Sequence, residues 1–262
     1  MDKDIKILII PDVHGRQFWK EPVKEVLEAT DAQIVFLGDY LSPYPYEWES
    51  DIDYNRISIE RFKEILELKR NNPLRITLLL GNHDATYAIG EDMCSCRMDR
   101  FNKKEIETLF EENHDLFQLA YEYNINEKKI IFSHAGILKG WVKSVWGNES
   151  EKDNFNVVDE LNKAWSEENY GSLDALGDYD RYRGWGGMKY GSPIWSDIQS
   201  WFNVKPEETY GFNIVGHSQL KDEPIMFDTI VDLDCRKAFY LNSNGDIFDY
   251  ETNEKIEKTK RP

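Results

Sequence analysis

Ile76-Thr77-Leu78-Leu79-Leu80-Gly81-Asn82-His83-Asp84 is the stretch of this 262-residue sequence that constrains the fold most strongly. The run from Ile76 to Leu80 predicts a short buried strand, because Gly81 ends it before a helix-length pattern can form. The residues after the glycine carry side chains that bind metals or transfer protons. The same arrangement, an apolar run that ends in a polar cluster, recurs at Asp12-Val13-His14-Gly15, Gly38-Asp39-Tyr40, Ser133-His134-Ala135-Gly136 and Gly216-His217-Ser218.

Segments with helical spacing lie between the first strands. Phe18–Ala29 and Ile57–Leu68 place their apolar residues on one side of a helix, and Lys104–Tyr123 has a long helical pattern. Strands this apolar, separated by helices, are typical of a largely parallel sheet that is covered on both faces. The first half of the chain is therefore predicted to be α/β.

The last third of the chain has a different pattern. Short runs at 224–231 and 238–241 predict antiparallel strands, and Asn244-Gly245 predicts a type I′ hairpin turn. We expect a single domain over residues 1–250 and a charged, frayed tail over residues 251–262. Within that domain, an aromatic-rich insert near residues 140–193 forms either a lid or binding loop, or aromatic packing over the core.

The polar clusters can meet in space although they lie far apart in the sequence, because ligands of open α/β sheets bind beyond the carboxyl ends of the strands. Together they offer two aspartates, one asparagine and four histidines. This mixed donor set suits Mn, Fe, Zn or Co, whereas Mg and Ca prefer oxygen ligands alone. Two ions would need a shared ligand, and by chemistry alone either Asp12 or Asp39 could bridge them.

Taken singly, each cluster has an ordinary explanation. Asp12-Val13-His14 fits a turn with a helix cap, Asn82-His83-Asp84 fits a capped helix start, and His134 or His217 alone fits a buried, hydrogen-bonded histidine. However, four of the five histidines follow strand-like runs. The fifth, His114, is expected to be solvated in the middle of a helix. The joint pattern therefore favours one shared site.

Composition and charge argue against several classes of protein. With 32 basic and 49 acidic residues the net charge is −17, so we expect no duplex nucleic acid partner. We also expect no membrane partner, because no apolar stretch approaches the roughly 20 residues of a span and the N-terminus does not resemble a signal peptide. Three cysteines, an odd count, indicate reduced thiols and a cytoplasmic location. Cys94 and Cys96 form a C-x-C that could hold a soft metal, although a lone pair is more often unremarkable.

Taken in order, the five clusters resemble the calcineurin-like metallophosphoesterases. The blocks D-x-H-G, G-D, G-N-H-D, S-H-A-G and G-H-S run from Asp12 to His217. They come closest to the branch that holds the Ser/Thr protein phosphatases and the symmetrical dinucleoside tetraphosphatases, and Trp195-Ser196-Asp197 is similar to the W-S-D of the former. The resemblance implies a four-layer α-β-β-α sandwich, in which two mixed β-sheets are flanked by helices. It also implies two divalent metal ions as cofactors, with Mn, Fe or Zn favoured.

The resemblance further implies a role for each residue of the blocks. Asp39 would bridge the two metals, and His83 would protonate the leaving oxygen without binding metal. A hydroxide bridging the metals would attack phosphorus in line, while the cations neutralise charge on the phosphate oxygens. The remaining implied ligands are Asp12 and His14 for the first metal, and Asn82, His134 and His217 for the second.

The chain departs from the family pattern in its second block. Ser42 stands where the protein phosphatases have the aspartate that orients the catalytic histidine, and Pro43 replaces their phosphate-gripping arginine. Other residues would have to fill both roles, and a guanidinium suits the second because it binds phosphate through two parallel hydrogen bonds. The candidates to orient His83 are Asp84, Asp51 and Asp53. The preferred arginines are Arg16 and Arg183, followed by Arg97, Arg100 and Arg181.

These features predict an enzyme that hydrolyses a phosphomonoester, on a phosphoprotein or a small phosphorylated molecule. Ser218-Gln219 follow His217, so the chain lacks the G-H-x-H of the phosphodiesterase branch, which argues against a cyclic nucleotide. One alternative is cleavage of a dinucleoside polyphosphate or a nucleic-acid end phosphate, with the insert stacking a base. Another is a non-catalytic scaffold that retains the fold, but none of the implied ligands is missing.

Overall fold

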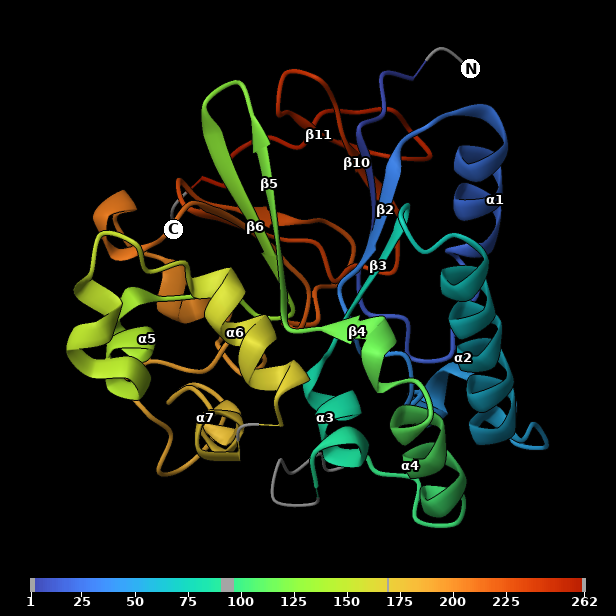
Figure 1. The fold of residues 1–262 in the computed structure, drawn as a ribbon. Coiled ribbons are helices and arrows are strands. Elements are labelled where there is room, and N and C mark those ends of the chain that lie inside the picture. Colours follow the sequence, from blue (N-terminus) through green and yellow to red (C-terminus); the bar gives the residue numbers. More distant parts are fainter. Residues whose placement is uncertain (1–2, 91–96, 169, 261–262) are drawn as a thin grey trace.

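The computed structural model describes residues 3–90, 97–168 and 170–260. Two mixed β-sheets pack face to face with helices on their outer sides (Figure 1). This confirms the four-layer α-β-β-α arrangement that the family resemblance implied. The C-x-C pair of Cys94 and Cys96 lies outside the described residues.

The first sheet has six strands in the described part of the chain, in the order β11-β10-β1-β2-β3-β4: β1 (Ile7–Ile10), β2 (Gln33–Phe36), β3 (Ile76–Leu79), β4 (Phe117–Gln118), β10 (Phe239–Leu241) and β11 (Ile247–Asp249). The neighbours from β1 to β4 pair in parallel, whereas β10 pairs antiparallel with both β1 and β11. The carboxyl ends of β1, β2 and β3 therefore meet at one edge.

The second sheet has the order β5-β6-β7-β9-β8 and consists of β5 (Ala120–Ile125), β6 (Lys128–Ser133), β7 (Phe212–Val215), β8 (Ile225–Met226) and β9 (Ile230–Asp232). β6, β7 and β9 run parallel, so their carboxyl ends also share an edge. The prediction of antiparallel strands holds for β9 against β8 but is wrong for β9 against β7. Its antiparallel hairpin partner β8 lies on the outside, which places β9 directly against β7 in a parallel register.

Seven α-helices occur among the described residues: α1 (Lys20–Ala29), α2 (Tyr54–Asn71), α3 (Asn82–Ala88), α4 (Lys103–Glu111), α5 (Lys139–Trp146), α6 (Val157–Ser166) and α7 (Tyr170–Asp174). Figure 1 shows α1 and α2 along the outer face of the first sheet, and α5, α6 and α7 on the opposite side of the molecule. None of these helices combines the length and the apolarity that crossing a bilayer requires.

The strands read as continuous apolar runs because both of their faces are buried. Along β1, Leu8 and Ile10 belong to the apolar cluster that includes α1 and α2, whereas Ile7 and Ile9 belong to the cluster between the two sheets. All four side chains are fully buried. Two-sided burial of this kind removes the alternation of polar and apolar residues that a half-exposed strand would show.

The predicted helix over Lys104–Tyr123 is wrong in its second half. The helix α4 ends at Glu111, and the chain continues through a 3₁₀ turn, His114–Leu116, into β4 and β5. This second half contains Phe117, Tyr121 and Tyr123, residue types that favour strands, and each strand finds a partner, β4 against β3 and β5 against β6. His114 therefore lies in the 3₁₀ turn and not in the middle of an α-helix, and its ring stacks on Trp165 with centroids 4.0 Å apart.

The C-terminal region forms the predicted hairpin, but with a different turn. Gly245 has a positive φ of 79° and Asn244 does not, so the turn is not type I′, which needs positive φ at both residues. The expected fraying of the tail is also wrong up to Thr259. The Ile256 N–H donates to the Ile247 carbonyl at 2.8 Å, and the Thr259 N–H donates to the Met226 carbonyl at 2.9 Å. The tail thus connects β11 of one sheet to β8 of the other.

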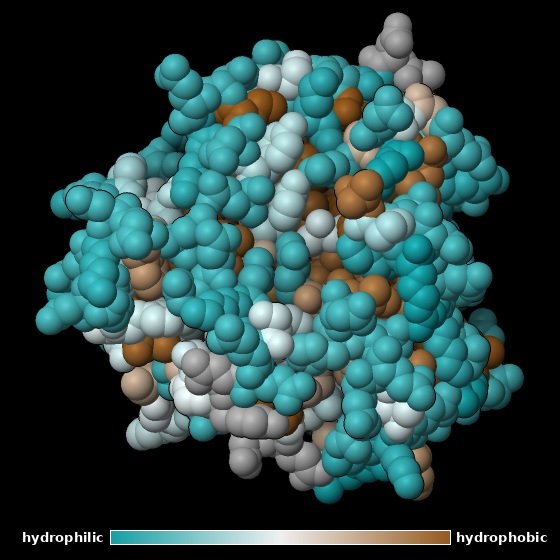
Figure 2. Space-filling view, in the orientation of Figure 1, coloured by the Kyte–Doolittle hydropathy of each residue, from teal (hydrophilic) through white to brown (hydrophobic). Residues whose placement is uncertain are grey.

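Side chains of the aromatic-rich insert divide between core and surface. Trp141 and Trp165 are buried in the same apolar cluster as α1 and α2, which supports aromatic packing for this part of the insert. Trp185 is instead fully exposed. On the face of the molecule in Figure 2, hydrophilic side chains dominate and apolar ones occur in small separate groups. This appearance agrees with a sequence in which 31% of residues are charged.

Candidate metal centre

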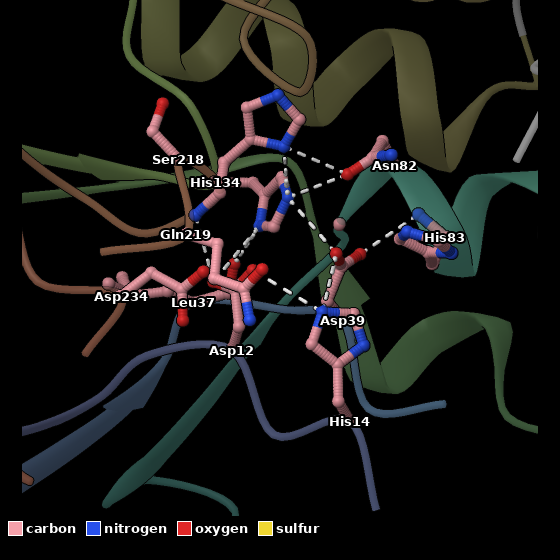
Figure 3. Close-up of polar contacts among 12 residues, drawn as sticks. Asp12, His14, Leu37, Asp39, Asn82, His83, His134, Ser218, Gln219 and Asp234 are labelled. Atoms are coloured by element: carbon pink, nitrogen blue, oxygen red, sulfur yellow. Dashed lines mark hydrogen bonds and ion pairs between the residues drawn. The ribbon is translucent and has the colours of Figure 1, made fainter. Parts of the chain in front are cut away.

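The polar residues that follow β1, β2, β3, β6 and β7 lie together where the carboxyl ends of these strands meet (Figure 3). The strands of each set run parallel, and the two sheets face one another, so loops distant in sequence converge on one point. Each of the six implied ligands is at most 8% exposed. These side chains are Asp12, His14, Asp39, Asn82, His134 and His217.

Asp39 occupies the middle of this group. Its Oδ2 lies 3.5 Å from Nε2 of His14 and 3.5 Å from Nε2 of His134. Asp12 is less central, with its Oδ2 3.7 Å from Nε2 of His14 and its Oδ1 accepting a hydrogen bond from the His217 N–H at 2.9 Å. Of the two aspartates that chemistry left open, Asp39 is therefore the one whose carboxylate lies between Nε2 of His14 and Nε2 of His134.

Backbone carbonyls fix the proton positions on two of the imidazoles. Nδ1 of His14 donates to the Leu41 carbonyl at 2.8 Å, and Nδ1 of His134 donates to the Leu37 carbonyl at 2.8 Å. A carbonyl oxygen only accepts, so in the neutral ring the proton is on Nδ1 and the lone pair of Nε2 points toward Asp39. In metal sites, hydrogen bonds of this type orient the histidines that bind the ion.

Three further atoms converge with their lone pairs on one point. Nε2 of His134, Nδ1 of His217 and Oδ1 of Asn82 are separated pairwise by 3.0 to 3.1 Å. A neutral His134 protonated on Nδ1 has no hydrogen to give on Nε2, so at most the proton of His217 can lie among the three atoms. Two acceptors at hydrogen-bond distance without a proton between them repel each other. A cation would turn this repulsion into coordination, so the donor set fits a metal.

Burial makes the two aspartates hard to ionise without a nearby cation. Burial raises the pKa of Asp12 to about 6 and that of Asp39 to about 7, and it outweighs the lowering of the Asp39 pKa by Arg97 and Arg183. Burial also lowers the pKa of His14 and of His134, which keeps both rings neutral. The carboxylates and neutral imidazoles themselves carry no positive charge, and divalent ions bound between them would supply it.

The backbone of the site adopts conformations that most residues avoid. His14, Asp39 and His217 have positive φ angles of 44°, 52° and 75°. Such strain concentrates at functional sites, where the surrounding structure holds it in place. A glycine is also required beside Asp12, because a Cβ on Gly216 would lie 2.1 Å from its Oδ1.

His83 lies at the start of α3, beside the six implied ligands. Its ring packs edge-on against that of His14, with centroids 5.2 Å apart, and its Nε2 lies 3.1 Å from Nη2 of Arg97. Burial, and then the charge of Arg97, keep the pKa of His83 well below its usual value. A ring nitrogen of His83 also lies within 4.8 Å of ligand atoms of His14 and Asp39. Its role as an acid rather than a ligand therefore stays a prediction.

The aspartates considered as orienting groups for His83 have other contacts. Asp84 is fully buried, and its carboxylate accepts backbone N–H groups of Asp39 at 2.6 Å, Tyr40 at 3.0 Å and Gly81 at 3.0 Å. It thereby fixes the loop that carries Asp39. Asp53 caps α2 by accepting the N–H of Arg56, and Asp51 is exposed.

The two preferred arginines lie next to the site but bind carboxylates. The guanidinium of Arg16 contacts both oxygens of Glu47, at 2.8 and 3.0 Å. Arg183 lies 2.8 Å from Oδ2 of Asp197, in the W-S-D segment, and donates to Oγ of Ser218 at 2.8 Å. Arg97 instead places its guanidinium 3.4 Å from the ring centroid of Tyr44. Three guanidiniums therefore surround the centre, and their role toward phosphate stays a prediction.

Two buried aspartates near the site were missed from the sequence. Asp232 ends β9, and Asp234 follows two residues later beside Asp12 (Figure 3). Burial raises the pKa of both well above the usual range, and the charge of Asp12 raises them further. The signal was available, since both follow an apolar strand as the other clusters do. Because this region was predicted to be antiparallel, the end of its strand was not expected beside the other clusters.

Comparison with known proteins gives one broad match. The family model described as calcineurin-like phosphoesterase matches residues 5–258. No curated protein matches the chain.

Solved structures give only distant likenesses. A protein serine/threonine phosphatase from Saccharomyces cerevisiae has 14% identity and a TM-score of 0.45, covering 100% of this chain and 82% of that chain. A hypothetical protein from Pyrococcus horikoshii OT3 has 12% identity and a TM-score of 0.38, covering 97% and 88%. The phosphatase domain of the Legionella effector WipB has 15% identity and a TM-score of 0.34, covering 64% and 66%. Likenesses this distant carry no argument about activity.

Proposed function

The chain belongs to the calcineurin-like phosphoesterase family and is a hydrolase that acts on phosphoester bonds, and we propose that its substrate is a phosphomonoester, on a phosphoprotein or a small phosphorylated molecule. We further propose that two divalent metal ions, Mn, Fe or Zn, serve the reaction. The observation that carries this proposal is the position of Asp39, whose Oδ2 lies 3.5 Å from Nε2 of both His14 and His134.

The proposed ligands divide into two groups that share Asp39. Asp12 and His14 complete the first group, and Asn82, His134 and His217 complete the second. When bound, the two ions would lower the pKa of a water molecule and neutralise negative charge on the phosphate. Nδ1 of His14 donates to the Leu41 carbonyl and Nδ1 of His134 to the Leu37 carbonyl. The lone pair of each Nε2 therefore points toward Asp39.

His83 and Arg97 are proposed to act together on the substrate. Nη2 of Arg97 lies at hydrogen-bond distance, 3.1 Å, from Nε2 of His83. A guanidinium only donates, so in this contact Nε2 accepts and carries no proton. A phosphate group that attracts Arg97 would release Nε2, which could then take up a proton and give it to the leaving oxygen. Binding of the phosphate would thus free Nε2 of His83 to carry the proton that the leaving oxygen needs.

Arg183 is proposed to contact the phosphate from the opposite side of the centre. Its charge acts on His134 and His217, whereas that of Arg97 acts on His14 and His83. A phosphate held between the two guanidiniums would lie over the metal positions, and the two arginines would offset a protein with a net charge of −17.

Metal analysis followed by a substrate panel tests the proposal. We expect close to two equivalents of Mn, Fe or Zn per chain, and release of phosphate from para-nitrophenyl phosphate or a phosphopeptide. The panel also includes the bis-ester bis(para-nitrophenyl) phosphate and a dinucleoside tetraphosphate. Activity confined to the bis-ester would overturn the monoester assignment, activity confined to the dinucleotide would establish the alternative substrate, and a metal-free, inactive protein would indicate a scaffold.

A further inference from the structure

A short aromatic segment, Tyr44–Glu47, lies beside the candidate metal centre and includes the 3₁₀ turn Pro45–Glu47. It directly follows Ser42 and Pro43, where the chain departs from the pattern of the protein phosphatases. The ring of Tyr44 packs edge-on against His14 with centroids 5.0 Å apart, and the ring of Tyr46 lies 5.5 Å from that of Tyr44. Two ring contacts in succession therefore lead from a proposed metal ligand to the surface.

Tyr46 is exposed and yet fixed in place. Its side chain is 71% exposed, and its hydroxyl accepts a hydrogen bond from Nε2 of Gln219 at 3.1 Å. Gln219 lies two residues after His217 and is drawn among the site residues in Figure 3. The hydrogen bond spans the segment after β2 and the segment after β7. An aromatic ring held in this way loses little conformational entropy when a ligand stacks on it.

Positive charge lies on the inner side of this aromatic segment. The guanidinium carbon of Arg97 is 3.4 Å from the ring centroid of Tyr44, and that of Arg16 is 5.3 Å from it. Moving outward from the metal centre, a ligand would therefore meet cationic groups first and the exposed ring of Tyr46 afterwards. This order fits a molecule with a phosphate at one end and a planar apolar group at the other.

We propose that Tyr46 is the stacking surface for a planar aromatic leaving group of the substrate, either a nucleoside or an aryl group. The inference rests on the proposed function and goes beyond it by naming the part of the substrate that is released. In the reaction, the oxygen of water forms a new bond to phosphorus and the bond from phosphorus to the ester oxygen breaks. That oxygen leaves with a proton as the nucleoside or the phenol, and inorganic phosphate is the second product.

Steady-state kinetics of Tyr46→Ala test this assignment. The substrates are a nucleoside 5′-monophosphate, para-nitrophenyl phosphate and glycerol 3-phosphate, the last of which has no ring. We expect KM to rise about tenfold for at least one ring-bearing substrate, as the loss of one stacking contact predicts, and to change less than twofold for glycerol 3-phosphate. The larger rise identifies whether the ring is a nucleobase or an aryl group. A KM that changes equally for all three substrates would overturn the proposal.

Two further variants separate stacking from indirect effects. Tyr46→Phe keeps the ring and should keep KM within about threefold of the native value, although it loses the contact with Gln219. Trp185→Ala removes a fully exposed ring of the insert and should leave KM unchanged. A tenfold rise in Trp185→Ala without one in Tyr46→Ala would place the ring on the insert and overturn the assignment.

A binding measurement keeps this inference independent of the hydrolysis. The ligands for calorimetric titration are a non-hydrolysable nucleoside 5′-methylenephosphonate and an aryl phosphonate. For at least one of these ligands, the dissociation constant should be about tenfold higher with Tyr46→Ala than with the native chain. If the native chain hydrolyses nothing but shows this difference, the proposed function fails and the ring site stands. If hydrolysis proceeds and neither dissociation constant changes, the ring site is overturned alone.

Discussion

At the scale of the residue, a single contact restrains His83, the proposed general acid. Arg97 lies at hydrogen-bond distance from its Nε2, and the ring is almost fully buried, so burial and the arginine both lower its pKa well below the usual value. An imidazole in this state is a poor acid until something displaces the arginine. The leaving oxygen of an alkyl ester is a strong base and needs a proton, whereas that of a nitrophenyl ester does not.

We therefore expect His83→Ala to lower kcat for an alkyl phosphate about 10²- to 10⁴-fold and to affect para-nitrophenyl phosphate much less. Its metal content, measured by elemental analysis, should match that of the native chain. His114→Ala is the control, since His114 stacks on Trp165 away from the metal centre and should retain full activity. A uniform loss for both esters together with loss of metal would make His83 a ligand instead.

At the scale of the element, the strands and their polar ends were predictable from the sequence. The runs that became β1, β2, β3, β6 and β7 are bounded by Pro or Gly or by polar residues, and each is buried on both faces, so their apolar character is continuous. The convergence of their ends then follows from parallel pairing. This reasoning brought the polar clusters together, whereas the choice of six ligands among them came from the family resemblance. By chemistry alone it left open whether Asp12 or Asp39 would bridge two metals.

Other elements depend on partners that the sequence does not reveal. The helix expected over Lys104–Tyr123 becomes strand after Leu116 because β3 and β6 offer free edges there. β9 lies between β7 and β8, parallel to the first and antiparallel to the second, although β8 alone is its neighbour in sequence. Likewise, the sequence around these residues does not indicate that Glu47 pairs with the guanidinium of Arg16 or that Arg97 packs on the ring of Tyr44. Pairing between distant segments decides each of these cases.

The end of β7 gives a prediction at this scale. A Cβ on Gly216 would lie 2.1 Å from Oδ1 of Asp12, so Gly216→Ala must displace the carboxylate that the His217 N–H holds. We expect a secondary structure close to native by circular dichroism and an affinity for Mn or Zn at least about tenfold weaker by calorimetry. Gly184→Ala is the matched control, because its new Cβ would meet nothing closer than 3.6 Å. Native metal affinity in Gly216→Ala would show that Asp12 is not held where binding requires it.

At the scale of the whole molecule, the net charge of −17 opposes the approach of an anionic substrate. Salt screens this repulsion, since the Debye length falls from about 30 Å at 0.01 M to about 8 Å at 0.15 M. We expect kcat/KM for a phosphomonoester dianion to rise about two- to threefold over this range. Choline chloride should act as sodium chloride does, which separates ionic strength from specific ion effects. A fall in kcat/KM would mean that local positive charge, and not the surface as a whole, governs encounter.

Metal removal should reveal how the whole fold depends on the buried carboxylates. Without metal, Asp12 and Asp39 have pKa values raised by burial to about 6 and about 7, above those of the unfolded chain. The folded state then holds more protons, so the stability of the metal-free protein falls as pH rises from about 4 through about 7. Ions that bind only the folded state have the opposite effect, and at a hundred times their Kd they add about 2.7 kcal/mol.

We therefore expect a chelator to lower Tm by about 5 to 10 °C at pH 8 and by clearly less at pH 5, with recovery on adding Mn or Zn. Asp39→Asn is the control variant, because an amide does not ionise and binds metal weakly. Its metal-free form should be more stable at pH 8 than the metal-free native chain, and the chelator should hardly change its Tm. Equal Tm losses in the native chain at both pH values would show that the two carboxylates are not the groups that the metals compensate.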